Sequence, residues 1–189
     1  TKKGKAGMQR IVFNSNLTVD HAICLPEFQD RYGASGATSW GTVPENANSK
    51  PIKAYDNVGD YFSNGVTATN SLSVMTGKEK MQTYFSYANT TAKGIVDVNK
   101  LQKHNITFRE TASLFNDRLT LDANVNLMTQ KIKNRPTSGG YYMNPLVGLY
   151  TFPRGEDLGV YRNDNGFEKY DENRAMPLQN WYTDISGFT

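Results

Sequence analysis

The chain has little of several features that define common protein classes. Its single cysteine, Cys24, allows no intrachain disulfide and no cysteine-rich zinc site. The two histidines, His21 and His104, are far apart in the sequence and show no metal-ligand spacing. No run approaches the roughly 18 consecutive apolar residues of a membrane-spanning helix. These 189 residues therefore resemble neither a disulfide-rich scaffold nor a helical membrane protein.

Excess charge of one sign is also scarce. The sequence holds 21 Lys and Arg against 18 Asp and Glu, a formal net charge of +3. A protein held on nucleic acid mainly by phosphate contacts needs a stronger basic excess, so a nucleic-acid partner is not expected. The length suits about one domain.

Residues that suit β-sheets are abundant. There are 11 Tyr and 9 Phe with many Thr, and 16 Gly and 7 Pro stand among numerous Asn. Aromatic and β-branched side chains pack well on a pleated surface, whereas Gly, Pro and Asn favour turns. The composition predicts an all-β fold.

Apolar and polar residues alternate with period two, the period of a strand, in five segments. The clearest runs from Leu119 to Leu127, where the odd positions are apolar and the even ones are polar. A second alternating segment has Arg109 on its polar side but places Glu110 on its apolar side. The predicted strands are 8–20, 70–76, 81–91, 105–115 and 119–131, paired in sequence order as one antiparallel meander.

The predicted connections alternate in length. Long stretches of about 49, 12 and 58 residues, at 21–69, 92–103 and 132–189, alternate with turns of about three or four residues. Short turns at one rim and long loops at the other are typical of an outer-membrane β-barrel. Five strands cannot close such a barrel, so the chain is expected to be a piece of a larger protein. A soluble sandwich has the same periodicity and remains an alternative.

Motifs of one family recur along nearly the whole sequence. They are Lys2-Lys3-Gly4-Lys5 with Gly7, Leu25-Pro26-Glu27-Phe28-Gln29 with Tyr32-Gly33, Ser39-Trp40-Gly41, Tyr61-Phe62 with Gly65, Ser86-Tyr87, Lys93-Gly94-Ile95, Leu114-Phe115-Asn116-Asp117-Arg118-Leu119, Asn144-Pro145-Leu146, Tyr150-Thr151-Phe152-Pro153-Arg154-Gly155 and Gln179-Asn180-Trp181. In this order they resemble the SusC-like (RagA-like) TonB-dependent outer-membrane transporters of Bacteroidetes.

The resemblance implies a domain organisation and a set of partners. Residues 1–7 would be the end of the plug domain, and 8–189 the first strands of a transmembrane barrel of about 22 strands, with extracellular loops 21–69, 92–103 and 132–189. The rest of the plug, the TonB box and the later strands would lie outside this sequence. The implied location is the bacterial outer membrane. The implied partners are outer-membrane lipids, a SusD-like lipoprotein, an oligosaccharide or peptide substrate, and TonB through the missing N-terminal region.

A barrel assignment predicts what each strand face contacts. Apolar residues such as Leu121 and Val125 would face lipid. The polar positions are lumen-facing candidates: Arg109, Asp122, Asn124 and Asn126.

The long loops are rich in aromatic residues, which stack on sugar rings and bury at interfaces. The substrate- or partner-facing candidates are Trp40, Tyr142, Tyr150, Phe152, Arg154 and Trp181. The alternative is that these side chains pack the loops against one another.

No catalytic residue, cofactor or metal site is predicted. Asn163-Asp164-Asn165-Gly166 is similar to a calcium loop, but Tyr161 occupies the position of the first carboxylate. Serine residues lack a nucleophile-elbow pattern. Two functions remain: part of a nutrient importer that is not an enzyme, or a soluble β-sheet module that binds carbohydrate or protein.

Overall fold

The computed structural model describes residues 6–23, 25–28, 55–133, 144–152 and 155–181. The chain divides into two compact units. The sheet unit comprises residues 1–19, 66–93 and 100–133, and the loop unit comprises residues 20–65, 94–99 and 134–189.

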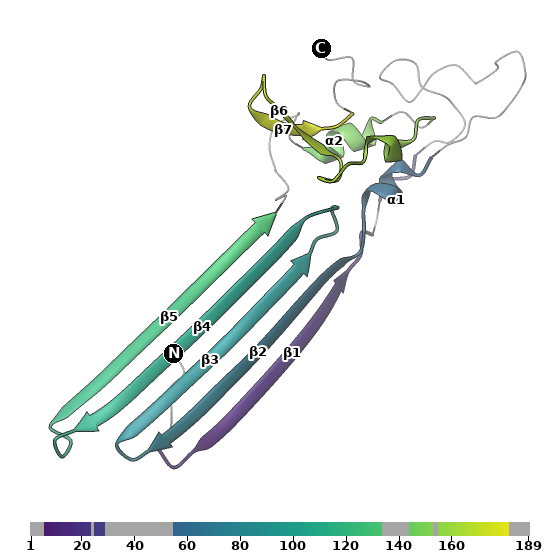
Figure 1. Cartoon of the computed structure of the whole chain (residues 1–189). Coiled ribbons are helices and arrows are strands. Elements are labelled where there is room, and N and C mark those ends of the chain that lie inside the picture. The colour runs from purple at the N-terminus through teal and green to yellow at the C-terminus, as the bar shows by residue number, and fades with distance from the viewer. Residues whose placement is uncertain (1–5, 24, 29–54, 134–143, 153–154, 182–189) are drawn as a thin grey trace, which may run out of the picture. The chain divides into compact units, whose positions relative to one another are not determined.

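The sheet unit is one five-stranded sheet with the order β1-β2-β3-β4-β5 (Figure 1). Its strands are β1 (Gln9–Asp20), β2 (Gly65–Lys78), β3 (Met81–Lys93), β4 (Lys100–Leu114) and β5 (Leu119–Lys133). Neighbours from β2 to β5 pair antiparallel. The hydrogen bonds Gly77 N to Met8 O and Ser15 Oγ to Asn70 Oδ1 show the same antiparallel direction for β1 and β2. The chain is mostly β, with a few short helices, and the predicted five-stranded antiparallel meander is confirmed.

The strands are longer than the alternation predicted. β2 begins at Gly65 instead of Asn70, and β4 begins at Lys100 instead of Asn105. The predicted connection at 92–103 is therefore wrong in its bounds, because only residues 94–99 separate β3 from β4. The predicted loops 21–69 and 132–189 are also too long, because β2 begins at Gly65 and β5 ends at Lys133. Lysine, threonine and glutamine interrupt the apolar alternation near these strand ends, but backbone pairing continues through them.

Tight turns join the strands at the other end of the sheet. Glu79 and Lys80 connect β2 to β3, and residues 115–118 connect β4 to β5. In the second turn Phe115, Asn116 and Asp117 all have positive φ, a backbone region that Asn and Asp tolerate better than most residues. Two of the three residues with positive φ in this turn, Asn116 and Asp117, are therefore of types that tolerate this backbone conformation.

The loop unit contains short elements around a small core. They are α1 (Asn57–Tyr61), α2 (Pro145–Tyr150), the 3-10 helix η1 (Leu158–Tyr161) and the hairpin of β6 (Glu168–Asp171) and β7 (Met176–Gln179). Asp56 caps α1, and Asn144 with Pro145 begins α2, both favoured at helix starts. The buried core residues are Val58, Tyr61, Leu149, Phe152, Leu158, Phe167 and Trp181.

Candidate functional site

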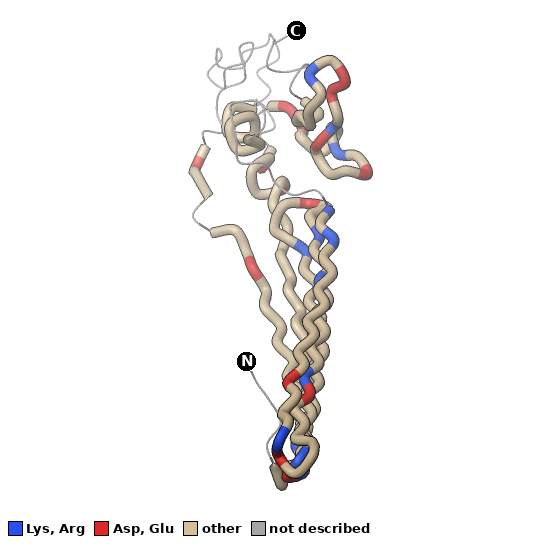
Figure 2. Tube along the Cα trace, turned by 90° about the vertical axis from the view of Figure 1, so that its left-hand side faces the viewer, with Lys and Arg blue, Asp and Glu red and all other residues tan. Residues whose placement is uncertain are grey.

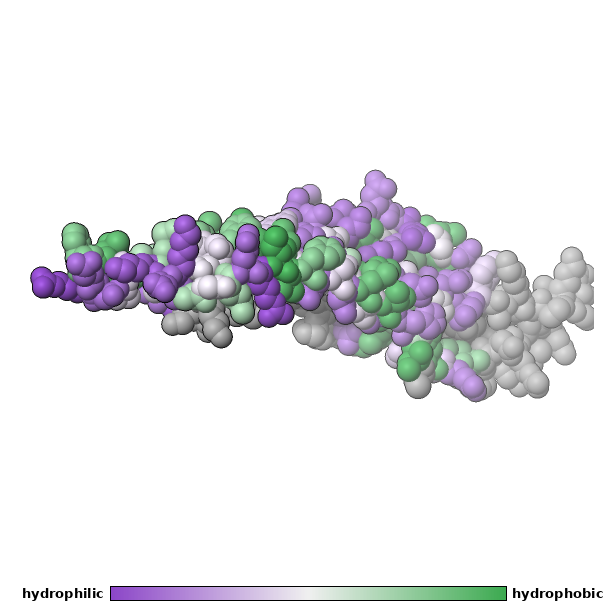
Figure 3. Space-filling view, turned by 90° about the horizontal axis from the view of Figure 1, so that it is seen from below, coloured by the Kyte–Doolittle hydropathy of each residue, from purple (hydrophilic) through white to green (hydrophobic). Residues whose placement is uncertain are grey.

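The register of the sheet unit sorts its side chains into two faces of opposite character. One face carries the even positions of β2 and β4 and the odd positions of β1, β3 and β5, and we call it the apolar face. Its large apolar side chains are exposed: Ile11, Phe13, Leu17, Val19, Val66, Leu72, Met81, Phe85, Tyr87, Ile106, Phe108, Leu114, Leu119, Leu121, Val125 and Leu127. In Figure 3 hydrophobic side chains are visible at the surface beside hydrophilic ones. A face of this size needs an apolar cover.

Four strands carry apolar segments of the same length. On the apolar face these segments are residues 11–19 of β1, 66–74 of β2, 106–114 of β4 and 119–127 of β5. Each runs over nine residues and ends on an apolar side chain at both limits, while Ser15, Asn70 and Glu110 occupy the central positions of the first three. A tilted strand crosses the hydrocarbon core of a bilayer with about 9–11 residues. β3 is shorter in this respect, since its apolar positions on the same face run only from Met81 to Tyr87.

The apolar segments do not lie level with one another across the sheet. Through the register, Ser15 at the centre of the β1 segment is level with Thr129, whereas the β5 segment is centred at Ala123. Six residues correspond to about 20 Å along a strand, while four strand spacings of about 4.8 Å cross the sheet. The centres of the β1 and β2 segments are level with each other, and so are those of the β4 and β5 segments, so the whole displacement falls between β2 and β4. Averaged over the five strands, the apolar band runs at about 45° to them.

A stretch without charged residues separates two groups of charges along the strands. Figure 2 shows a tan stretch between the blue lysines near the long connections and the mixed charges nearer the tight turns. Between the apolar segments and the lysines, Tyr87 stacks on His104 with ring centroids 6.1 Å apart, and its hydroxyl lies 2.8 Å from His104 Nδ1. Such amphipathic rings are typical of the boundary between an apolar layer and water.

The second face of the sheet, the polar face, holds the predicted lumen residues. Arg109 donates from Nε and Nη2 to the two carboxylate oxygens of Asp122, at 2.9 and 2.5 Å. This fork is the strong geometry for an Arg–carboxylate pair. Asn124 lies directly opposite Arg109 and Asn126 directly opposite Thr107. The register therefore brings all four predicted residues, from two adjacent strands, onto one face.

Glu110 is an exception on the apolar face. It lies opposite Thr83 and Ala123, and its Oε1 is buried without a hydrogen-bond partner. An unpaired carboxylate oxygen among apolar neighbours lowers stability. The break that Glu110 makes in the apolar alternation of the sequence thus places a carboxylate on the apolar face of the structure.

The loop unit packs its aromatic side chains on one another. Trp181 meets Tyr61, Phe152 and Phe167 edge to face, with centroid distances of 6.4, 5.9 and 6.1 Å. Phe152 and Trp181 are only 1% and 2% exposed. In this structure neither ring offers a surface to substrate or partner, so packing accounts for both.

The other loop candidates have different outcomes. Tyr150 is half-buried, with its ring 5.9 Å from that of Phe28. Trp40, Tyr142 and Arg154 lie outside the described residues. A role in ligand contact stays a prediction for these three.

A buried asparagine, which the sequence analysis did not single out, holds two loop-unit segments together. Asn57 donates from Nδ2 to the Glu156 carbonyl at 2.8 Å and accepts from the Leu158 amide at 3.0 Å. Its position one residue after a helix cap gives no sequence signal, because both partners lie about a hundred residues further along. Asn57 therefore fixes α1 against the start of η1.

Two acidic groups shape the electrostatics beside Tyr61. Burial raises the pKa of the Tyr61 hydroxyl, and the carboxylates of Glu168 and Asp97 raise it further. Burial also raises the pKa of Glu168. Arg162 pairs with Asp97 at 2.5 Å. Tyr61 is therefore protonated at neutral pH and packs in the core of the loop unit.

The segment similar to a calcium loop forms a closed turn. Asn163 and Gly166 bond through their backbones, and Asn163 Oδ1 accepts from the Asn165 amide at 2.7 Å. The part of the chain that the structure describes contains no group of three or more His, Cys, Asp or Glu arranged for a metal ion. The turn is therefore stabilised by its own hydrogen bonds.

None of the helices among the described residues is long and apolar enough to cross a membrane. No protein-family model matches the chain, and no curated protein matches it.

Proposed function

We propose that the chain is part of a TonB-dependent outer-membrane importer of the SusC-like type, and that β1–β5 are strands of its transmembrane barrel. The importer takes up oligosaccharides or peptides with a SusD-like surface lipoprotein, and it is not an enzyme. TonB acts on it through a region N-terminal to this sequence.

The observation that carries this proposal is the oblique apolar band. Its inclination, averaged over the five strands, is about 45° and falls within the strand tilt typical of membrane barrels, and the nine-residue segments of four strands suit a bilayer core. Lipid would cover side chains such as Leu17 and Val125, which are 68% and 49% exposed. The barrel itself, with about 22 strands, is inferred from the family resemblance.

The polar face supports a lumen assignment. Asp122, Asn124 and Asn126 present carboxylate and amide groups that remain hydrated in a water-filled or plug-filled interior. Arg109 and Asp122 neutralise each other on that face. The same groups would be costly on the lipid side.

The loop unit suits an extracellular rim. Its segments follow the C-terminal ends of β1, β3 and β5 and precede the N-terminal ends of β2 and β4. In an antiparallel meander all of these strand ends lie at the same end of the sheet. With its own aromatic core it is a folded surface on which a lipoprotein lid would rest. Its exposed residues, and not Phe152 or Trp181, would make that contact.

A soluble β-sheet module that binds carbohydrate or protein is the second candidate. The exposed apolar face is also compatible with this second candidate, because a second sheet packed on that face would cover its side chains. An oblique band of constant length is not required by that packing.

Membrane fractionation of the complete protein tests the proposal. The importer is expected in the outer-membrane fraction, is extracted only with detergent, and migrates faster on gels before heating than after. Deletion of the partner lipoprotein should impair uptake of the substrate. Recovery of the complete protein in the soluble fraction without detergent would contradict the proposal and favour the soluble module.

A further inference from the structure

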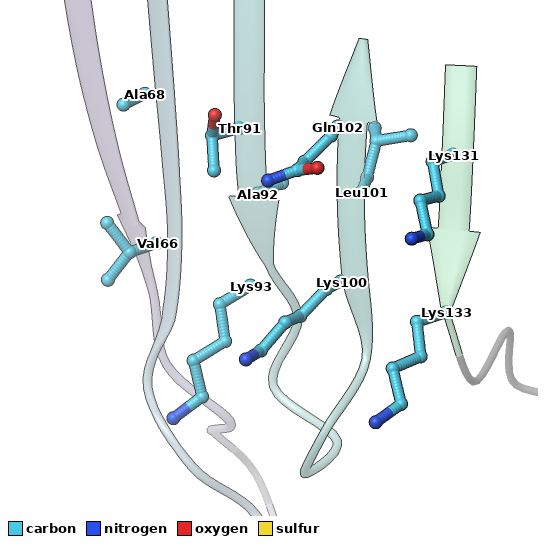
Figure 4. Close-up of a pocket in the computed structure, with 10 residues that line it drawn as sticks. All are labelled: Val66, Ala68, Thr91, Ala92, Lys93, Lys100, Leu101, Gln102, Lys131 and Lys133. Carbon is cyan, nitrogen blue, oxygen red and sulfur yellow. The ribbon is translucent and has the colours of Figure 1, made fainter.

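Four lysines lie on the apolar face, close to the strand ends that lead into the long connections. Lys93, Lys100 and Lys133 are directly opposite one another on three adjacent strands, and Lys131 lies opposite Gln102 in the next row. All four side chains are exposed. Figure 4 shows them projecting from the same side of the sheet, from β3, β4 and β5.

This arrangement is unfavourable unless an anion is present. Like charges directly opposite one another on neighbouring strands destabilise a sheet. Among the described residues none of the four lysines forms a salt bridge. The neighbouring positions of the same face hold no Asp or Glu, since they are Thr91, Gln102 and, on β2, Val66 and Ala68.

The lysines border a shallow hollow of about 520 Å³. Besides the lysines its lining includes Thr91 and Gln102, which offer hydrogen bonds, and Val66 and Ala68, which are apolar. Val66 and Ala68 belong to the apolar segment of β2, so the apolar band continues directly into the hollow. The site therefore combines a positive end with an apolar end.

We propose that this hollow binds the phosphorylated headgroup of an anionic glycolipid of the outer leaflet, with the acyl chains lying on the apolar band. The assignment rests on the proposed function, because only a membrane barrel places this face in a bilayer. Clustered lysines at the edge of an apolar membrane surface attract phosphate groups. Their methylene stems cover apolar surface while the ammonium groups reach the headgroup layer.

The test is native mass spectrometry of the complete protein in detergent, titrated with bisphosphorylated lipid A. The test variant is Lys93→Gln, Lys100→Gln and Lys133→Gln together, and we expect its affinity to be at least about tenfold weaker. The matched control combines Lys78→Gln, at the opposite end of the same face, with Lys103→Gln, near the same strand ends but on the polar face. The control should bind like wild type.

Two further ligands separate a lipid from other anions. Dephosphorylated lipid A should bind wild type as weakly as lipid A binds the triple variant, and inorganic phosphate alone should bind at least about tenfold more weakly than lipid A. Equal affinity of wild type and triple variant, an equal loss in the control, or tight binding of inorganic phosphate would each overturn the inference. If the triple variant does not fold, Lys133→Gln alone replaces it and should weaken binding severalfold.

Failure of this inference is distinguishable from failure of the proposed function. A protein that fractionates with the outer membrane but keeps wild-type lipid affinity after the triple substitution refutes only the lipid site. A protein found in the soluble fraction refutes both.

Discussion

Placing an arginine on either side of β5 should have very different effects in the complete protein. Val125 is on the apolar face, about 5 Å from the midplane of the band if the strands tilt by 45°. Arginine near the middle of a lipid-facing strand costs about 2–4 kcal/mol. Asn126 is on the polar face opposite Thr107, and an arginine there remains hydrated without directly opposing Arg109. We expect Val125→Arg to lower stability by about 2–4 kcal/mol, and Asn126→Arg by less than about 1 kcal/mol.

The assay is urea unfolding of the protein folded into liposomes, followed by heat-dependent gel mobility. A third variant, Val125→Phe, separates lipid from a protein core. Fluid lipid accommodates the larger ring, whereas overpacking a core costs about 1–3 kcal/mol. Equal losses for the two arginine variants would refute the assignment of the faces. A large loss for Val125→Phe would refute lipid as the cover.

Three other substitutions test individual features. Glu110→Leu removes the unpaired carboxylate from the apolar face and should raise stability in liposomes by up to about 2 kcal/mol, measured as an increase in the urea midpoint. Gly148→Val should destabilise the loop unit by about 1–3 kcal/mol, because even a Cβ there would lie 3.0 Å from Trp181 Nε1. Trypsin should then cleave this unit faster, while the heat-dependent gel mobility of the complete protein stays unchanged. The Arg174 backbone amide and guanidinium lower the pKa of Asp171. The contribution of the Asp171 carboxylate to stability is therefore present above the ordinary pKa of about 3.9 and is lost as the pH falls through the lowered value. Amide protection in the β6–β7 hairpin should decrease over that acidic range in wild type but not in Asp171→Asn.

The meander was predictable because most of its strands alternate cleanly. In β5 every odd position from 119 to 127 is apolar, and this pattern defines the strand and its two faces. The ends of β2, β3 and β4 were not predictable from alternation, since residues such as Lys93, Lys100 and Gln102 occupy the apolar face there. Backbone pairing with a neighbour, which a single segment does not reveal, extends these strands.

The loop unit was harder to predict. Its helices are short, and signals such as Asp56 and the Asn144-Pro145 pair are too common to identify a helix of five or six residues. Whether an aromatic side chain packs or binds depends on contacts between distant segments. Trp181 has the same sequence character as an interface residue, yet it lies against Tyr61, Phe152 and Phe167. The inclination of the apolar band likewise needs the register, which no strand contains alone.

The central claim is that the apolar face of the sheet contacts lipid. It is tested most directly by spin labels at single cysteines replacing each residue from 119 to 127, in a Cys24→Ser background, with the complete protein in liposomes. Labels at odd positions should collide preferentially with oxygen, which concentrates in lipid, and labels at even positions should collide preferentially with a water-soluble nickel chelate. Labels at odd positions that are open to the nickel chelate, or protected from both reagents, would contradict the claim.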